Sequence, residues 1–178
     1  MKYFFDTEFI DYARKLHIIS IGIISEDNRT LYNINVNCEF RLASDWVQKN
    51  VLAQLPGFDS DGIEIIGEGY GHLAAERVDR SLGWCHSSRI AKNIIDFVGD
   101  DNTPEFWADY GAYDWVVLCN IFGGMLNLPK HFPMYVQDLQ QLKRHLGIEK
   151  IPIPEIGEHH ALNDAKTLKL RYEWLIRG

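Results

Sequence analysis

Four carboxylates and one histidine in this chain have the residue types and the order that hydrolytic metal chemistry needs. Asp6 and Glu8 follow an apolar run in KYFFDTEF, Asp114 opens the apolar stretch DWVVLCNIFGG, and Asp164 follows His159 by five residues. Mg²⁺ and Mn²⁺ prefer carboxylate oxygens, and two such ions about 4 Å apart can activate a water and stabilise the leaving oxygen of a phosphodiester. A histidine of near-neutral pKa can take the proton from that water. The set therefore indicates a metal-dependent hydrolase.

Each acid also has an ordinary structural explanation. Asp6 and Glu8 can end a strand beside a lysine or arginine, which is the commoner origin of a lone D-x-E after an apolar run. Asp114 can be a first-turn acid stabilised by the helix dipole, and Asp109 in the preceding strand is an alternative to it. Asp164 can pair with a basic residue. The presence of all four acids in this order favours the metal site.

The elements that must hold these residues alternate between strands and helices. Residues 2–6, 17–25 and 31–40 predict an antiparallel meander, and Asn33 and Asn35 are expected on a solvent-exposed face. A short strand at 105–110 and a strand or turn near 134–138 follow. The apolar periodicity predicts helices over about 43–55, 87–98, 114–123, the stretch before Gly147, and 160–176. This order predicts an α/β sandwich with a mixed sheet, with Trp46 and Trp107 in the core.

Length, charge and cysteine content limit the class of protein. The chain has 178 residues, enough for one buried core, and three scattered cysteines, which favour a reducing cytoplasm. No run approaches the ~20 apolar residues of a membrane span, so no membrane partner is expected. The net charge of −7 argues at first against nucleic acid. Two bound divalent cations would reduce it to −3 and would themselves attract phosphate.

Three segments resemble the motifs of a known superfamily. FFDTEF, YGAYDWVVLC and HHALNDA are similar to the three exonuclease motifs of the DEDDh, or DnaQ-like, 3′-5′ exonucleases. The helix SDWVQKNVLAQLP extends the likeness to a branch typified by a mycobacterial exoribonuclease. The resemblance implies a ribonuclease H-like α/β fold, with a mixed five-stranded sheet of a three-stranded antiparallel meander plus parallel strands, flanked by helices. It also implies that residues 1–178 form a single exonuclease domain.

The resemblance assigns roles position by position. It implies that two Mg²⁺ or Mn²⁺ ions are held by Asp6, Glu8, Asp114 and Asp164. The family spacing of histidine, four residues and aspartate selects His159 as the general base, whereas His160 occupies the place of a tyrosine in a variant branch. Thr7 and Phe9 are the expected substrate-binding residues. Phe9 and Ile10 replace the family's usual threonine and glycine, and the Phe9 ring can stack on a base.

The function that follows from the resemblance is hydrolysis of phosphodiester bonds from the 3′ end, with release of nucleoside 5′-monophosphates. The expected partner is a nucleic acid single strand or a 3′ overhang, RNA more than DNA, and the branch suggests a homodimer. The competing hypothesis is a ribonuclease H-like module that binds nucleic acid without turnover. The intact set of ligands favours the enzyme.

Overall fold

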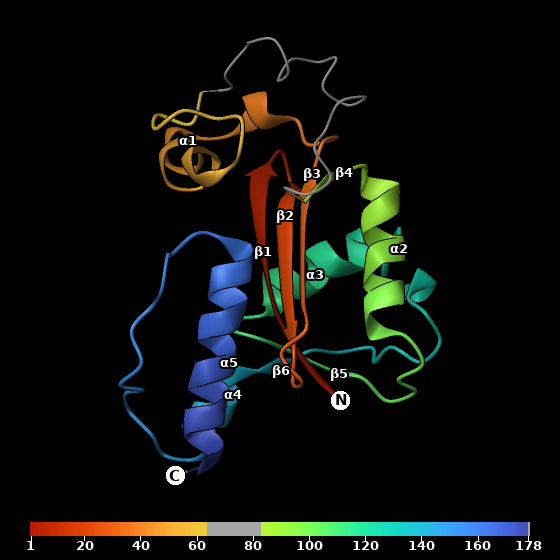
Figure 1. The fold of residues 1–178 in the computed structure, drawn as a ribbon, viewed down its shortest axis with the longest axis vertical. Helices are drawn as coiled ribbons and strands as arrows, with labels where there is room; N and C mark the ends of the chain where they lie inside the picture. Colours follow the sequence, from red (N-terminus) through yellow and green to blue (C-terminus); the bar gives the residue numbers. More distant parts are fainter. Residues whose placement is uncertain (64–82, 178) are drawn as a thin grey trace.

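The computed structural model describes residues 1–63 and 83–177, in which a mixed β-sheet lies between helices (Figure 1). The sheet has six strands in the order β4-β3-β2-β1-β5-β6. The strands are β1 (Lys2–Tyr12), β2 (Lys15–Ser25), β3 (Thr30–Asn35), β4 (Trp84–Cys85), β5 (Glu105–Ala108) and β6 (Gln137–Asp138). The α/β, ribonuclease H-like class is confirmed. The predicted count of five strands was one too few, because the two-residue edge strand β4 carries too little pattern to be recognised.

The pairing of the strands follows the predicted topology. β1, β2 and β3 form an antiparallel meander, while β4, β5 and β6 pair in parallel with β3, β1 and β5. Helices α2 (Ser87–Val98) and α3 (Ala112–Ile121) pack on one face of the sheet. Helices α4 (Leu139–His145) and α5 (Ala161–Arg177) pack on the other. Figure 1 shows α1 (Asp45–Asn50) closing one end of the meander.

The first strand is longer than its apolar run suggested. It was predicted over 2–6, but it pairs with β2 as far as Tyr12, with a register shift between Glu8 and Phe9. Asp6 and Glu8 therefore lie in the middle of the strand, and the prediction that they end it was wrong. The cause is the ladder itself, because β2 supplies hydrogen-bonding partners beyond the apolar residues.

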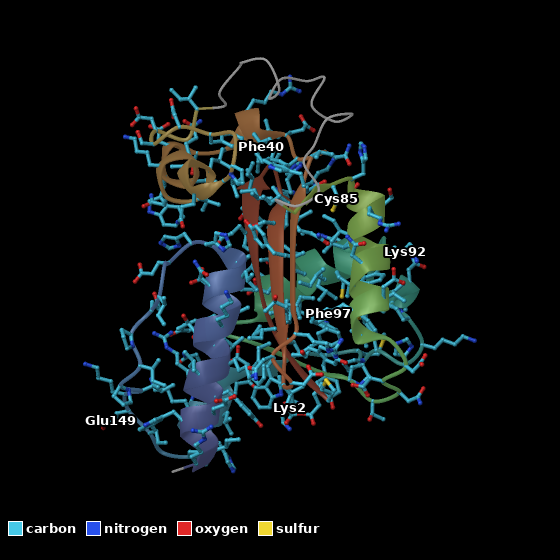
Figure 2. The ribbon with its side chains drawn as sticks, viewed as in Figure 1. Lys2, Phe40, Cys85, Lys92, Phe97 and Glu149 are labelled. Atoms are coloured by element: carbon cyan, nitrogen blue, oxygen red, sulfur yellow. The ribbon has the colours of Figure 1, made fainter. Side chains whose placement is uncertain are left out.

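Alternation along the strands divides the core into layers. Tyr3 and Phe5 point toward α2 and α3, whereas Phe4 packs with Tyr172 of α5. A third cluster lies under α1 and its flanking 3₁₀ turns, η1 (Phe40–Leu42) and η2 (Leu52–Gln54). Figure 2 shows Phe40 and Lys2 at opposite ends of the sheet. A further 3₁₀ turn, η5 (Met125–Asn127), follows α3.

Three expectations about burial were tested by this packing. Asn33 and Asn35 are buried rather than solvent-exposed, because α2 covers this face and Asn93 donates to Asn33 Oδ1 at 3.0 Å. Trp107 is buried as expected, but Trp46 is 54% exposed and the prediction that it lies in the core was wrong. The third strand of the meander was predicted over 31–40, but it ends at Asn35, where a turn leads into η1.

The remaining predicted helices need only small corrections. The helix expected over 43–55 is divided into α1 and η2, and Ser44 caps α1 by accepting a hydrogen bond from Val47 N. Gly99 ends α2 with φ of 62°, a value that glycine adopts without a steric cost. Among the described helices, none combines the length and apolar character that a membrane span requires.

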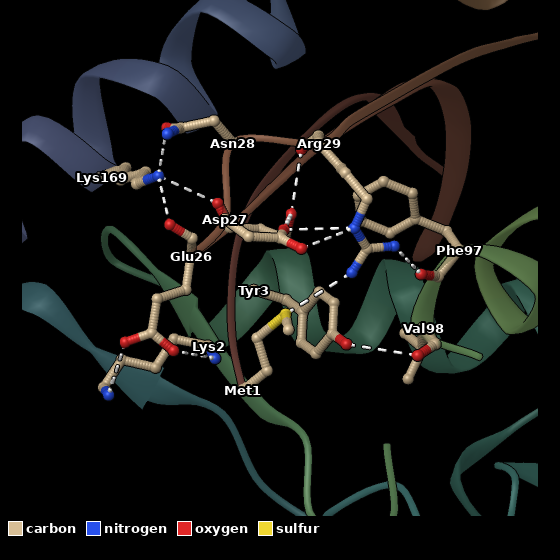
Figure 3. A network of polar contacts seen from close by, with 11 residues as sticks. Met1, Lys2, Tyr3, Glu26, Asp27, Asn28, Arg29, Phe97, Val98 and Lys169 are labelled. Atoms are coloured by element: carbon tan, nitrogen blue, oxygen red, sulfur yellow. Dashed lines mark hydrogen bonds and ion pairs between the residues drawn. The ribbon is translucent and has the colours of Figure 1, made fainter. Parts of the chain in front are cut away.

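The middle of α5 is anchored to the sheet by a buried lysine. Lys169 Nζ donates to the carbonyl oxygens of Ser25 and Glu26, both at 3.0 Å, and to Asn28 Oδ1. Figure 3 shows this ammonium beside the turn between β2 and β3. Because these three oxygens accept hydrogen bonds from the Lys169 ammonium, the lysine can stay charged in the interior. It fixes to the sheet the helix whose first turn carries Asp164.

Candidate active site

Three carboxylates meet where α5 begins on the sheet. Asp6, Glu8 and Asp164 each offer an oxygen atom, and these oxygens all lie within 4.8 Å of one another. Asp6 and Glu8 share a face because they are two residues apart on β1. Asp164 lies in the first turn of α5, where its Oδ2 also accepts a hydrogen bond from His160 N at 3.1 Å. We call Asp6, Glu8 and Asp164 the three-acid cluster.

A glycine on β2 brings the helix close enough to form this cluster. Gly22 pairs directly with Asp6, so the two residues face the same side of the sheet. A Cβ atom at Gly22 would lie 2.2 Å from Leu162 N and 2.3 Å from Leu162 Cα. The backbone of α5 therefore occupies the space that any side chain at position 22 would need. This close approach carries Asp164 to the two acids of β1.

The electrostatics of the cluster are unfavourable in the absence of a cation. Burial, reinforced by repulsion from neighbouring acids, holds the pKa of Asp6 well above its usual range and raises the pKa of Glu8 to about 8. Burial also raises the pKa of Asp164 to about 6. In residues 1–63 and 83–177, no lysine or arginine forms an ion pair with these three acids. A donor set of hard oxygen atoms that repel one another suits Mg²⁺ or Mn²⁺.

Asp114 reaches the same region from the opposite face of the sheet. It lies in the first turn of α3 and is 7% exposed. Its Oδ1 accepts hydrogen bonds from Thr7 N at 3.0 Å and from Thr7 Oγ1 at 2.6 Å. Its charge contributes to the raised pKa values of Asp6 and Glu8. Thr7 is itself buried, so its hydroxyl is committed to orienting Asp114.

The alternative acid Asp109 has other partners. Gln140 Nε2 donates to its Oδ1 at 2.7 Å, and Arg171 Nη1 lies 3.6 Å from its Oδ2. Arg171 also donates to Glu155 Oε1 at 3.0 Å, so it joins the last helix to the segment before His159. Asp109 therefore already has a cationic partner, which argues against it as a metal ligand. The role of Asp114 as the fourth ligand stays a prediction.

A pocket of about 190 Å³ opens beside the three-acid cluster. Its lining includes Asp6, Asp164, His159 and Tyr110. Tyr110 and His159 have φ angles of 54° and 65°, in the left-handed region that non-glycine residues rarely adopt. Such backbone conformations gather at functional sites. The sequence carries no signal for either conformation, and it also left Tyr110 and Arg171 out of the expected site.

The two adjacent histidines occupy different environments. The His159 side chain lines the pocket, and its ring meets the Trp46 ring edge to face, with the ring centroids 4.8 Å apart. The His160 ring stacks on Tyr32 at 4.5 Å, and its Nδ1 is buried without a hydrogen-bond partner in the described structure. Burial lowers the pKa of His160. Only His159 of this pair lines the pocket, as a base acting on a bound water requires.

Phe9 follows the register shift in β1 and extends the site along the strand. Its ring stacks on Tyr113 of α3, with centroids 5.9 Å apart and an interplanar angle of 12°. Tyr113 is itself exposed. Sequence reasoning singled out Phe9 but missed Tyr113, whose place beside Phe9 depends on how α3 packs. The two stacked rings place an aromatic pair at the position after Glu8 on β1.

Comparison with known proteins identifies the family. Residues 68–173 match the model of the Rv2179c-like 3′-5′ exoribonuclease domain. Two relatives from Mycobacterium tuberculosis, the 3′-5′ exoribonuclease Rv2179c of strain H37Rv and the 3′-5′ exoribonuclease MT2234.1 of strain CDC 1551, are each 32% identical over 174 residues. The alignment covers 97% of this chain and 91% of each relative. The chain belongs to the Rv2179c-like 3′-5′ exoribonuclease family.

Proposed function

We propose that this protein is a divalent-metal-dependent 3′-5′ exoribonuclease that releases nucleoside 5′-monophosphates. The three-acid cluster carries the proposal, because half-buried carboxylates that raise one another's pKa values need a cation, and these have none among the described lysines and arginines. RNA is the proposed substrate because the two relatives are named exoribonucleases. A single strand or a 3′ overhang is the proposed form of that substrate.

Each residue has a distinct task in this proposal. Asp6, Glu8 and Asp164 would hold two Mg²⁺ or Mn²⁺ ions, with Asp114 as the fourth ligand. When bound, such ions supply an activated water and stabilise charge on the leaving oxygen. His159 takes the proton of that water, since its ring lines the same pocket as Asp6 and Asp164.

Two further residues of the first motif support the site. Thr7 keeps Asp114 in place through two hydrogen bonds, which is a positioning task rather than the direct substrate contact that the sequence suggested for it. Phe9 offers its stacked ring to the terminal base of the substrate. Base stacking tolerates all four bases, so little sequence preference is expected at this position.

We further propose that residues 1–178 form one catalytic domain and that the protein assembles as a homodimer. The single-domain proposal is supported by the packing of all three described apolar clusters against the same sheet. The homodimer rests on the family resemblance. Sedimentation velocity at several protein concentrations tests it, and a single species with the mass of one chain would contradict it.

The decisive experiment compares two conservative substitutions on one strand. Asp6→Asn should abolish the ladder of shortened products from a 5′-labelled RNA single strand in Mg²⁺. Asp11→Asn, on the exposed part of β1, should leave the ladder unchanged. Full activity of Asp6→Asn would refute the proposed metal site. A wild-type protein that binds Mn²⁺ in calorimetry but produces no ladder would instead be the non-catalytic binding module.

A second comparison tests the choice of base and substrate. His159→Ala should lose most of kcat while still binding Mn²⁺, whereas His160→Ala should lose less. The opposite order would assign the proton transfer to His160. A matched DNA strand degraded as fast as the RNA strand would contradict the proposed selectivity for RNA, which depends on contacts to the 2′-OH.

A further inference from the structure

The segment that carries His159 has little structure of its own. Residues 151–155 are irregular, bends and turns follow, and α5 begins only at Ala161. Pro152 and Pro154 remove backbone donors from this stretch. Gly157 and His159 both have φ of 65°. Apart from Glu158, whose Oε2 lies 3.9 Å from His159 Nε2, the contacts that orient the His159 ring come from other parts of the chain.

Two of these contacts come from α1 and η2, about one hundred residues earlier in the chain. Gln54 Nε2 donates to the carbonyl oxygen of Glu158 at 2.7 Å. The Trp46 indole meets the His159 ring with an interplanar angle of 77° and a centroid distance of 4.8 Å. One contact holds the backbone just before His159, and the other holds its side chain.

The sheet supplies a third contact, on the far side of His159. The next residue, His160, stacks on the Tyr32 ring at an interplanar angle of 22°. Its backbone N–H donates to Asp164 Oδ2. His159 therefore lies between a fixed residue on each side, and its ring has Trp46 as its aromatic neighbour.

Trp46 is the residue in this set whose position the core does not explain. The other apolar side chains of this region, Val47, Val51 and Leu52, belong to the cluster under α1, whereas Trp46 is more than half exposed. A large aromatic side chain left in solvent gains little from the hydrophobic effect. Its edge-to-face contact with His159 has the geometry in which aromatic rings attract each other.

We infer that Trp46 is a positioning residue that holds the His159 imidazole toward the three-acid cluster. This inference rests on the proposed function, in which His159 accepts a proton from the attacking water. Trp46 takes no part in that proton transfer, since its indole only restricts the orientations of the neighbouring ring. A side chain that acts in this way changes the rate of the chemical step and leaves substrate affinity unchanged.

The experiment is a double-mutant cycle on single-turnover cleavage of a 5′-labelled RNA strand. Trp46→Ala should lower the rate about ten- to a hundredfold without raising KM, the size expected when a reacting group is misplaced by about an ångström. Trp46→Phe keeps an aromatic ring and should recover most of that loss. In a His159→Ala background, Trp46→Ala should cause no further loss, because the ring that it orients is gone.

Matched controls separate positioning from general damage. Trp174→Ala removes another partly exposed tryptophan, on α5, and should leave the rate unchanged. Mn²⁺ binding by calorimetry should be the same in wild type and Trp46→Ala. Gln54→Ala, which removes the neighbouring backbone anchor, should also lower the rate only when His159 is present. Trp46→Leu, which keeps an apolar side chain without the aromatic ring, should show the same loss as Trp46→Ala and keeps the inference testable if Trp46→Ala does not fold.

Three results would overturn the inference. An equal loss in both backgrounds would mean that Trp46 acts independently of His159. A raised KM with an unchanged rate would make Trp46 a stacking surface for RNA. Full activity of His159→Ala would leave no base to position, whereas the proposed metal-dependent nuclease would be refuted separately, by an active Asp6→Asn protein.

Discussion

Gly22→Ala tests whether the close approach of α5 to β2 builds the active site. The added Cβ would lie 2.2 Å from Leu162 N, 2.3 Å from Leu162 Cα and 2.4 Å from the carbonyl carbon of Ala161. These atoms are backbone, so no side chain can move aside. Real Cβ contacts essentially never fall below 3.0 Å, so the start of α5 must move by about 0.8 Å or more.

This displacement has a predictable cost in both stability and catalysis. Overpacking of this kind typically destabilises a protein by about 1–3 kcal/mol, so the variant should still fold. The helix would carry Asp164 away from Asp6, and a shift near 1 Å at a reacting centre costs about a hundredfold in rate. We therefore expect a large loss of kcat, weaker Mn²⁺ binding, and a modest loss of stability.

The assay compares Gly22→Ala with a glycine variant of similar stability. Gly147 has φ of 70° and no atoms within 4 Å of a built Cβ, so Gly147→Ala costs about 1–2 kcal/mol of backbone strain without moving α5 toward or away from the sheet. Urea denaturation measures stability, and single-turnover cleavage of labelled RNA measures the rate. Gly147→Ala should keep the wild-type rate. The reasoning would be refuted if Gly22→Ala also kept it.

Three further predictions concern the charges of the site. Because the pKa of Glu8 is raised to about 8 from the 4.5 of an ordinary glutamate, the metal-free protein should lose stability as pH rises between these values. In urea denaturation with EDTA, the free energy of unfolding of Glu8→Gln should exceed that of wild type by at most about 5 kcal/mol at pH 8 and should equal it near pH 4. A difference that does not change with pH would contradict the raised pKa of Glu8. Thr7→Val removes the hydroxyl that donates to Asp114 but keeps the backbone N–H bond, and it should weaken Mn²⁺ binding in calorimetry, while unchanged affinity would mean that the hydroxyl is not needed to position Asp114. Arg171→Met leaves Asp109 and Glu155 without their cation and should destabilise the protein by about 1–3 kcal/mol in urea, whereas a neutral effect would mean that solvent replaces the pair.

Local patterns were enough to predict most of the elements. The β-branched run of β2 and the Gly99 stop of α2 both lie within a residue or two of where the sequence indicated. The prediction failed where a neighbour far along the chain controls the outcome. β1 continues past its apolar run because β2 pairs with it, and Asn33 is buried because Asn93 of α2 reaches it.

The candidate site shows the same division. The identity and order of its acids can be read directly from the chain, since the chemistry of a carboxylate needs no neighbour to be recognised. The hydrogen-bond partners of Asp114 could not be predicted from the sequence, because both bonds come from Thr7, which lies on another element. The aromatic pair of Phe9 and Tyr113, and the ion pair of Arg171 with Asp109, are likewise products of packing.

The sequence by itself determined the α/β class, the family resemblance and the residues to examine, because side-chain periodicity and motif order are properties of the chain. Only the tertiary structure decided that Asp6 and Glu8 lie in mid-strand, that His159 rather than His160 lines the pocket, and that Trp46 is exposed beside it. The physical reason is that a pattern reports which face of an element is buried. What covers that face depends on how distant elements pack.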